Sequence, residues 1–293
     1  MKAPSFAYQK VTNLDEALQR LHDYGDAARL LAGGQSLLPA LNLRLTHPQC
    51  LIDIAGLDAL RGERLHQHTL ELGALTTHRE IASSALVKTH IPLLAMAVPY
   101  VAHAAIRNRG TIGGSLALAD PAAEYPAVAL ACEASMCIQS LRGERKVKAS
   151  DYFQGLYQTA LESDEILCAV EFPIARRNER FGFQELARRH GDYAMAGLAA
   201  RASISEEDRI EQLHLVFFAL GDRPMLATNA IACLIGQRVD SQTIRAAQQA
   251  LDDDLSPPDD LQAKAATKLH WAKVLLGRVL AALASNKGVR AND

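Results

Sequence analysis

Hydrophobic positions in the first part of the chain alternate between helical spacing and short apolar runs. Asn13 with Glu16 resembles a capping box, and the apolar residues that follow recur three and four positions apart, which predicts a helix to about Tyr24. Short apolar runs bounded by turn residues predict strands at residues 28–32, 51–54 and 69–73. Helices and strands are therefore interleaved, but without the regular βαβ alternation of a Rossmann fold.

The pattern changes twice before the middle of the chain. Thr77 with Glu80 is a second capping-box pattern and predicts a helix start, and the mostly apolar segment 92–105 predicts one longer helix. Residues 165–172 alternate as a strand does, and Pro173 ends them before a charged stretch. We place a domain boundary there.

The remaining chain predicts a small sheet backed by helices. Strands are expected at 181–186, 197–204 and 213–220. Helices are expected near Ala227, Ser241 and Leu261, with an acidic Pro-Pro loop at 252–260. The fold class is therefore α+β, with a first domain at 1–175 and a second at 176–293.

Composition narrows the function classes. The chain has 293 residues, of which 49% are hydrophobic and 22% charged, and its net charge of -2 gives no basic surface for nucleic acid. No apolar run has membrane-spanning length, and the N-terminus lacks the apolar core of a signal peptide, so a cytoplasmic protein is expected. The five cysteines form no CxxC pair, which predicts structural thiols and no metal site.

A glycine pair follows the strand predicted at 28–32. Gly33 and Gly34 would let backbone N–H groups approach an anion closely, because no Cβ intervenes, and Ser36 adds a hydroxyl. A plain tight turn is the competing interpretation.

A second glycine pair strengthens the anion hypothesis. Thr111 and Ser115 flank Gly113 and Gly114, and we expect the glycines to present a second set of free backbone donors. Two such cradles suit a diphosphate, and backbone dipoles would neutralise it without many lysines.

Several segments together resemble a known family. They are residues 32–39, 73–78, 107–115, 120–126 and 188–194. In order and spacing they are similar to the FAD-binding medium subunit of the molybdenum hydroxylases, the xanthine dehydrogenase and carbon monoxide dehydrogenase family. The resemblance covers nearly the whole chain. It implies an FAD domain of the vanillyl-alcohol oxidase (PCMH) type, with subdomains at about 1–57 and 58–175, followed by the flavoprotein C-terminal domain of this family.

The resemblance also implies the cofactor site, in which residues 32–37 and 111–115 hold the diphosphate of FAD. The full set of expected FAD contacts is Ala32, Gly33, Gly34, Gln35, Ser36, Leu37, Thr77, His78, Val101, Asn108, Gly110, Thr111, Gly113, Gly114, Ser115, Glu124, Leu167 and Tyr193. No residue is expected to act as a catalytic acid or base, because the implied role is electron transfer.

Four of these residues have competing interpretations. Glu124 stands where the family usually has an Asp that contacts the ribose or adenylate part of FAD, but it could be a solvated loop acid. Tyr193 matches the position of an aromatic ring over the isoalloxazine, but it could be a buried core tyrosine. The alternative for Leu167 is simple packing in the core. The alternative for His78 is a capping or packing role.

The resemblance finally implies partners. Molybdopterin is expected on a large subunit and two 2Fe-2S clusters on a small one, in a heterotrimer that dimerises. The complex would hydroxylate an N-heteroaromatic, an aldehyde or a similar small molecule. A stand-alone FAD oxidoreductase of the same fold and a non-catalytic scaffold with purely structural glycine turns are the alternatives.

Overall fold

The N-terminal part is built on three short parallel strands in the order β1-β3-β2. The computed structural model describes residues 2–285 and 289–290. The elements of this part are β1 (Ala7–Lys10), α1 (Leu14–Tyr24), β2 (Ala28–Leu31), α2 (Leu37–Asn42) and β3 (Cys50–Asp53). The predicted first helix and the strands at 28–32 and 51–54 are confirmed to within a residue. Asn13 caps α1 by accepting the Glu16 N–H at 2.8 Å.

A second, antiparallel sheet has the order β4-β5-β10-β6-β7. Its strands are β4 (Glu63–Leu65), β5 (Thr69–Gly73), β6 (Ser135–Ser140), β7 (Gly143–Lys148) and β10 (Ile166–Pro173). The helices between β5 and β6 are α3 (His78–Ser83), α4 (Ala85–His90), α5 (Pro92–Ala97), α6 (Ala104–Arg107), α7 (Ile112–Leu118) and α8 (Glu124–Ala131). A short helix α9 (Ala149–Tyr152) and the hairpin β8 (Phe153–Gly155) and β9 (Gln158–Thr159) precede β10.

The single helix expected at 92–105 is wrong. Helix α5 ends at Ala97, and α6 begins only at Ala104. Pro99 has no N–H of its own, so it cannot continue the hydrogen-bond pattern of α5. Ala102 adopts a left-handed φ of 45°, and the Arg107 guanidinium donates to its carbonyl at 2.6 Å and to that of Val101 at 2.9 Å, which stabilises the turn.

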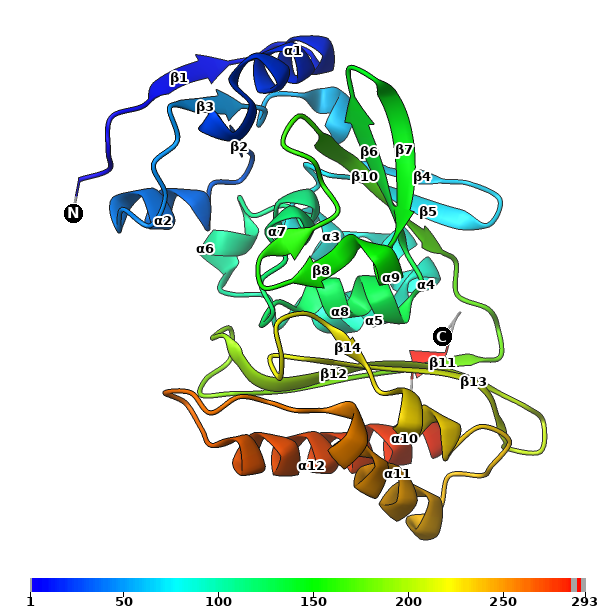
Figure 1. Ribbon diagram of the computed structural model, residues 1–293. Coiled ribbons are helices and arrows are strands. Elements are labelled where there is room, and N and C mark those ends of the chain that lie inside the picture. The colour runs from blue at the N-terminus through cyan, green and yellow to red at the C-terminus, as the bar shows by residue number, and fades with distance from the viewer. Residues whose placement is uncertain (1, 286–288, 291–293) are drawn as a thin grey trace.

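The C-terminal part is a sheet in the order β14-β13-β12-β11-β15 with helices on one face (Figure 1). The strands are β11 (Glu179–Ala187), β12 (Ala194–Ile204), β13 (Ile210–Phe218), β14 (Met225–Leu226) and β15 (Val289–Arg290). The helices are α10 (Thr228–Ala232), α11 (Ser241–Asp254) and α12 (Ala265–Ala284). The three predicted strands and three predicted helices of this half are all present.

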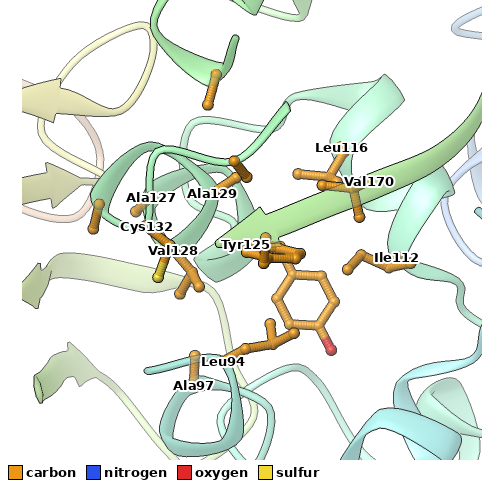
Figure 2. Packing of buried hydrophobic residues seen from close by; sticks show 14 of the residues in the cluster. Leu94, Ala97, Ile112, Leu116, Tyr125, Ala127, Val128, Ala129, Cys132 and Val170 are labelled. Atoms are coloured by element: carbon orange, nitrogen blue, oxygen red, sulfur yellow. The ribbon is translucent and has the colours of Figure 1, made fainter. Parts of the chain in front are cut away.

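The other face of this sheet packs against α5 and α8, as Figure 1 shows. Residues from both sides form one hydrophobic cluster, in which Phe183 and Phe218 of the sheet stack at 5.7 Å between ring centroids. Figure 2 shows Tyr125 of α8 within this cluster, between Leu94 of α5 and Ile112 of α7. The sheet is therefore fixed to the helices that follow the second glycine loop. Within the described residues, no helix is long and apolar enough to cross a membrane.

A buried ion pair reinforces this contact. Arg201 of β12 binds Glu179 of β11 at 2.6 Å, and the two residues are only 7% and 1% exposed. The same guanidinium reaches Glu133, just after α8, at 3.2 Å. Burial and the pairing have opposite effects on the Arg201 pKa, and the net effect is to raise it, so the charge is retained.

We expect Arg201→Met to lower the free energy of unfolding by about 3–5 kcal/mol, because Glu179 would be left as an unpaired buried charge. Urea denaturation followed by circular dichroism measures this. The matched control is Lys146→Met, which removes an exposed pair with Glu171 and should cost less than about 1 kcal/mol. Equal losses in the two variants would contradict the role given to Arg201.

Candidate functional site

The two glycine loops lie directly against each other. A Cβ at Gly33 would stand 2.1 Å from the carbonyl oxygen of Arg109 and 2.9 Å from the Cα of Gly110. No side chain fits in that space, since real Cβ contacts do not fall below about 3 Å. The chain that follows β2 and the chain that precedes α7 therefore meet backbone to backbone, although they are more than seventy residues apart in sequence.

The first loop presents unused donors. Among the described residues, no acceptor pairs with the backbone N–H groups of Gly33, Gly34, Gln35 or Ser36. Gly34 has a left-handed φ of 73°, which glycine adopts without strain. The Gln35 side-chain amide donates to the Gly33 carbonyl at 3.0 Å and so fixes the turn. Successive free N–H groups in such a turn form an anion-binding concavity.

The expectation that Gly113 and Gly114 offer free donors is wrong. The Gly113 N–H donates to the Ala74 carbonyl at 2.9 Å, and the Gly114 N–H donates to the Thr111 hydroxyl oxygen at 3.1 Å. Thr111 is the N-cap of α7, and this bond is its cap. Its hydroxyl hydrogen is still free to donate, and the Ser115 hydroxyl has no partner among the described residues.

Close packing explains the glycines of the second loop instead. A Cβ at Gly113 would lie 2.4 Å from the Cβ of Ala74, directly after β5. A Cβ at Gly110 would lie 2.7 Å from Nε2 of His78, whose backbone N–H donates to the Gly110 carbonyl at 3.0 Å. The second loop is thus held between the end of β5 and the start of α3.

Thr77 and His78 serve this packing. Thr77 caps α3 in a reciprocal capping box with Glu80, as predicted. His78 is 5% exposed and stacks edge-on against Tyr125 at 5.1 Å. Burial, aided by the nearby Arg107 charge, lowers the His78 pKa to about 4, so the ring is neutral at pH 7. His78 therefore packs in the protein interior, its contact with FAD stays a prediction, and its Nδ1 is buried without a hydrogen-bond partner among the described residues.

The exposure of Glu124 and of Tyr193 contradicts the competing interpretation of each residue. Glu124 begins α8 and is 7% exposed, so it is not a solvated loop acid. Burial is the main cause that raises its pKa to about 7; a backbone hydrogen bond at Glu124 itself lowers the pKa, and the nearby Asp120 charge contributes to the rise. Tyr193 is 67% exposed and is not a core residue. It lines a cavity of about 330 Å³ together with Asp120 and Tyr157.

The other residues expected to contact FAD differ in how deeply they are buried. Val101 and Leu167 are 8% and 5% exposed and belong to the largest of the described hydrophobic clusters, and their contact with FAD stays a prediction. Asn108 is exposed at the C-terminal end of α6. The loop that carries Tyr193 reaches this region, because a Cβ at Gly191 would lie 2.6 Å from the Ala102 carbonyl oxygen.

Sequence reasoning missed Glu185 of β11. Its side-chain Oε2 is buried without a partner among the described residues, and burial followed by the Glu124 charge raises its pKa to about 8. The signal was present in the alternation of Phe181, Phe183 and Glu185, which puts all three side chains on one face of the strand.

Known families match both halves of the chain. Residues 4–175 match the FAD binding domain in molybdopterin dehydrogenase. The chain belongs to this family of FAD-binding medium subunits of molybdenum hydroxylases. Residues 181–283 match the CO dehydrogenase flavoprotein C-terminal domain, which is the second part of the family pattern.

Individual relatives are similar over almost their full length. The chain is 36% identical to the 6-hydroxypseudooxynicotine dehydrogenase complex subunit alpha of Paenarthrobacter nicotinovorans, over 96% of this chain and 95% of that one. It is 33% identical to the carbon monoxide dehydrogenase medium chain of Hydrogenophaga pseudoflava, over 96% and 97%. Like these medium subunits, the chain is part of an oxidoreductase.

Solved structures of the family superpose closely. Carbon monoxide dehydrogenase from Hydrogenophaga pseudoflava aligns with a TM-score of 0.94 at 33% identity, over 99% of this chain and 100% of that chain. Quinoline 2-oxidoreductase from Pseudomonas putida 86 aligns with a TM-score of 0.92 at 37% identity, over 98% and 99%.

We expect Gly33→Ala to weaken FAD binding by about tenfold or more, because forcing a methyl group against the Arg109 carbonyl costs about 1–3 kcal/mol and separates the loops. Titration of FAD-free protein, followed by flavin fluorescence, measures the dissociation constant. Gly56→Ala is the control, since a Cβ there meets nothing nearer than 3.7 Å. Unchanged binding by Gly33→Ala would contradict the requirement for backbone contact.

Proposed function

We propose that this chain is the electron-transfer subunit of a heterotrimeric molybdenum hydroxylase. In this role its FAD takes electrons from iron-sulfur clusters on a partner subunit and passes them to a terminal acceptor. The observation that carries the proposal is the row of unpaired N–H groups at Gly33 to Ser36, held rigidly against the second loop in a chain of this family. We also infer that the chain divides into domains at 1–175, with subdomains at about 1–57 and 58–175, and at 176–293.

The residues fit the diphosphate of FAD in an asymmetric way. The first loop would donate its backbone N–H groups, and the hydroxyls of Thr111 and Ser115 would donate from the opposite side. The glycines at 110, 113 and 114 would act by leaving space, since their packing already requires small residues.

The remaining contacts would position the flavin. Bound FAD would supply two-electron and one-electron redox chemistry, and the protein would supply its orientation and surroundings. Tyr193, exposed on a cavity, can lay its ring on a planar group and shield it from water. Neutral His78 keeps a positive charge away from the site.

The partners are inferred from the relatives. The relatives are named as a subunit or medium chain of dehydrogenases. One related structure is named as a carbon monoxide dehydrogenase that lacks the Mo-pyranopterin moiety of its molybdenum cofactor, and another is named as a Cu,Mo-CO dehydrogenase. We therefore place molybdopterin on a large subunit and two 2Fe-2S clusters on a small subunit, in a dimer of heterotrimers. Relatives named for caffeine, nicotine and quinoline make an N-heteroaromatic substrate our preferred class, ahead of an aldehyde.

Purification of a tagged chain from its native host tests the assembly. We expect two further chains, together with molybdenum, iron and FAD. Anaerobic substrate should bleach the flavin absorbance of the complex and leave that of the isolated chain unchanged. Turnover by the isolated chain would instead establish the alternative, a stand-alone FAD oxidoreductase.

If Tyr193 stacks on the flavin, two substitutions at this position should affect FAD binding differently. Tyr193→Leu should raise the FAD dissociation constant about threefold to tenfold, since such a ring contact contributes about 0.5–1.5 kcal/mol. It should also increase the fluorescence of bound flavin, because the quenching ring is lost. Tyr193→Phe keeps the ring and should behave as the wild type; a loss equal to that of Tyr193→Leu would count against stacking.

A further inference from the structure

Acidic residues are missing from the two stretches of chain around the first glycine loop. Residues 27–52 and 81–119 contain no Asp or Glu, although the whole chain has 33 such residues. The first stretch includes the first glycine loop and α2, and the second includes α6 and α7. The two stretches meet where Gly33 lies against the backbone of Arg109. They therefore contribute only positive or neutral side chains to the surface around the proposed diphosphate site.

Three exposed arginines in these stretches have no counter-charge. They are Arg29 on β2, Arg44 after α2 and Arg109 after α6, and none of them forms an ion pair with another described residue. The first two bond only to backbone carbonyls. Elsewhere in the chain, exposed arginines such as Arg64 and Arg142 pair with carboxylates. The three guanidinium groups are therefore available to pair with carboxylates of another molecule.

Exposed leucines accompany these charges. Leu38, Leu43 and Leu45 are 43%, 55% and 75% exposed, and all three belong to one short segment at α2, which Figure 1 shows at the outer edge of the N-terminal part. Leu38 packs against the first loop, since a Cβ at Gly34 would lie 3.1 Å from its side chain. The backbone N–H groups of Arg44 and Leu45 donate to carbonyls of α2, which folds the segment back on the helix. We call the three leucines and Arg44 the α2 surface.

The position and the charge of the α2 surface fit one kind of partner. The proposed function brings electrons to the flavin from 2Fe-2S clusters on a small subunit. Because electron transfer slows steeply with distance, that subunit has to contact this chain close to the flavin site. The α2 surface meets this requirement, since Leu38 belongs to it and packs against the first loop. A 2Fe-2S cluster ligated by four thiolates has a net negative charge, which the unpaired arginines complement.

We propose that the α2 surface is the docking site of the iron-sulfur subunit, and that the contacting face of that subunit is apolar at its centre and acidic at its edge. This inference rests on the proposed function. The leucines would lose their contact with water, and the arginines would pair with carboxylates around them, as in other protein interfaces. A second copy of this chain is disfavoured as the occupant, because it would bring arginines against arginines.

Cross-linking in the intact complex identifies what covers the α2 surface. A photo-cross-linking amino acid in place of Leu45 should join this chain to the chain that carries the 2Fe-2S clusters, and mass spectrometry of the linked product identifies that chain. The control position is Leu261, a leucine before α12 that is 103% exposed, and it should give no link to the same chain. A link from position 45 to the molybdenum-containing chain or to a second copy, or no link at all, would overturn the inference.

Two substitutions test the apolar centre of the α2 surface. Leu43→Asp combined with Leu45→Asp should weaken binding of the iron-sulfur subunit about tenfold or more, because carboxylates buried against apolar groups are costly. The measurement is the loss of iron per FAD in complex purified through a tag on this chain. Both leucines are exposed in the chain itself, so circular dichroism and FAD retention should match the wild type. Leu261→Asp is the matched control and should retain the iron; an unchanged iron content in the double variant would contradict the docking role.

A charge reversal tests the edge of the α2 surface. Arg44→Glu should release the iron-sulfur subunit at a lower salt concentration than the wild type, because the new charge repels an acidic face and salt screens the remaining pairs. Arg177→Glu is the control, since Arg177 is also exposed and forms no ion pair with another described residue, but lies outside the two acid-free stretches. Equal salt sensitivity of the two variants would overturn the inference and leave the proposed function intact. A wild-type chain that purifies with FAD but without any partner chain would overturn the proposed function itself.

Discussion

The site depends on one contact between two stretches of main chain, Gly33 against the carbonyl of Arg109. This contact joins the N-terminal parallel sheet to the loop that starts α7. The second loop is itself held by Gly113 against Ala74 and by Gly110 against His78. Because each approach leaves no room for a Cβ, the relative position of the two loops is fixed by backbone geometry and tolerates little change in either. The unpaired N–H groups of the first loop are therefore aimed before any ligand arrives, which lowers the entropic cost of binding.

The two glycine pairs therefore have different roles, although their sequences are similar. Each is a pair of glycines close to a serine or threonine hydroxyl. The hydrogen bonds separate them, because Ala74 and Thr111 take the donors of the second pair while those of Gly33 and Gly34 have no acceptor. Sequence could not show this for Gly113, since the Ala74 carbonyl lies directly after β5, more than thirty residues earlier in the chain.

The features of the fold that could be predicted from the sequence are those decided by residues close to one another in the chain. The caps at Asn13 and Thr77 and the strands of the C-terminal sheet follow from neighbouring residues, and the structure has them within a few positions. The hairpin of β6 and β7 was missed, since β7 is mostly charged and exposed and gives no apolar alternation. The burial of Glu124 was also beyond local reasoning, because it is decided by α8 packing on strands that begin seventy residues later.

The charges around the site also favour one position for the diphosphate of a bound FAD. The Asp120 carboxyl, on the cavity that Tyr193 lines, disfavours an anion there, whereas the N–H dipoles of the first loop attract one. In FAD the diphosphate lies between two uncharged ends, so these groups would direct the diphosphate to the first loop and leave the cavity for an uncharged end. Tyr193, next to the C-terminal sheet, would then contact a planar ring and not a phosphate, because the only anionic part of the cofactor is already bound by the backbone of the first loop.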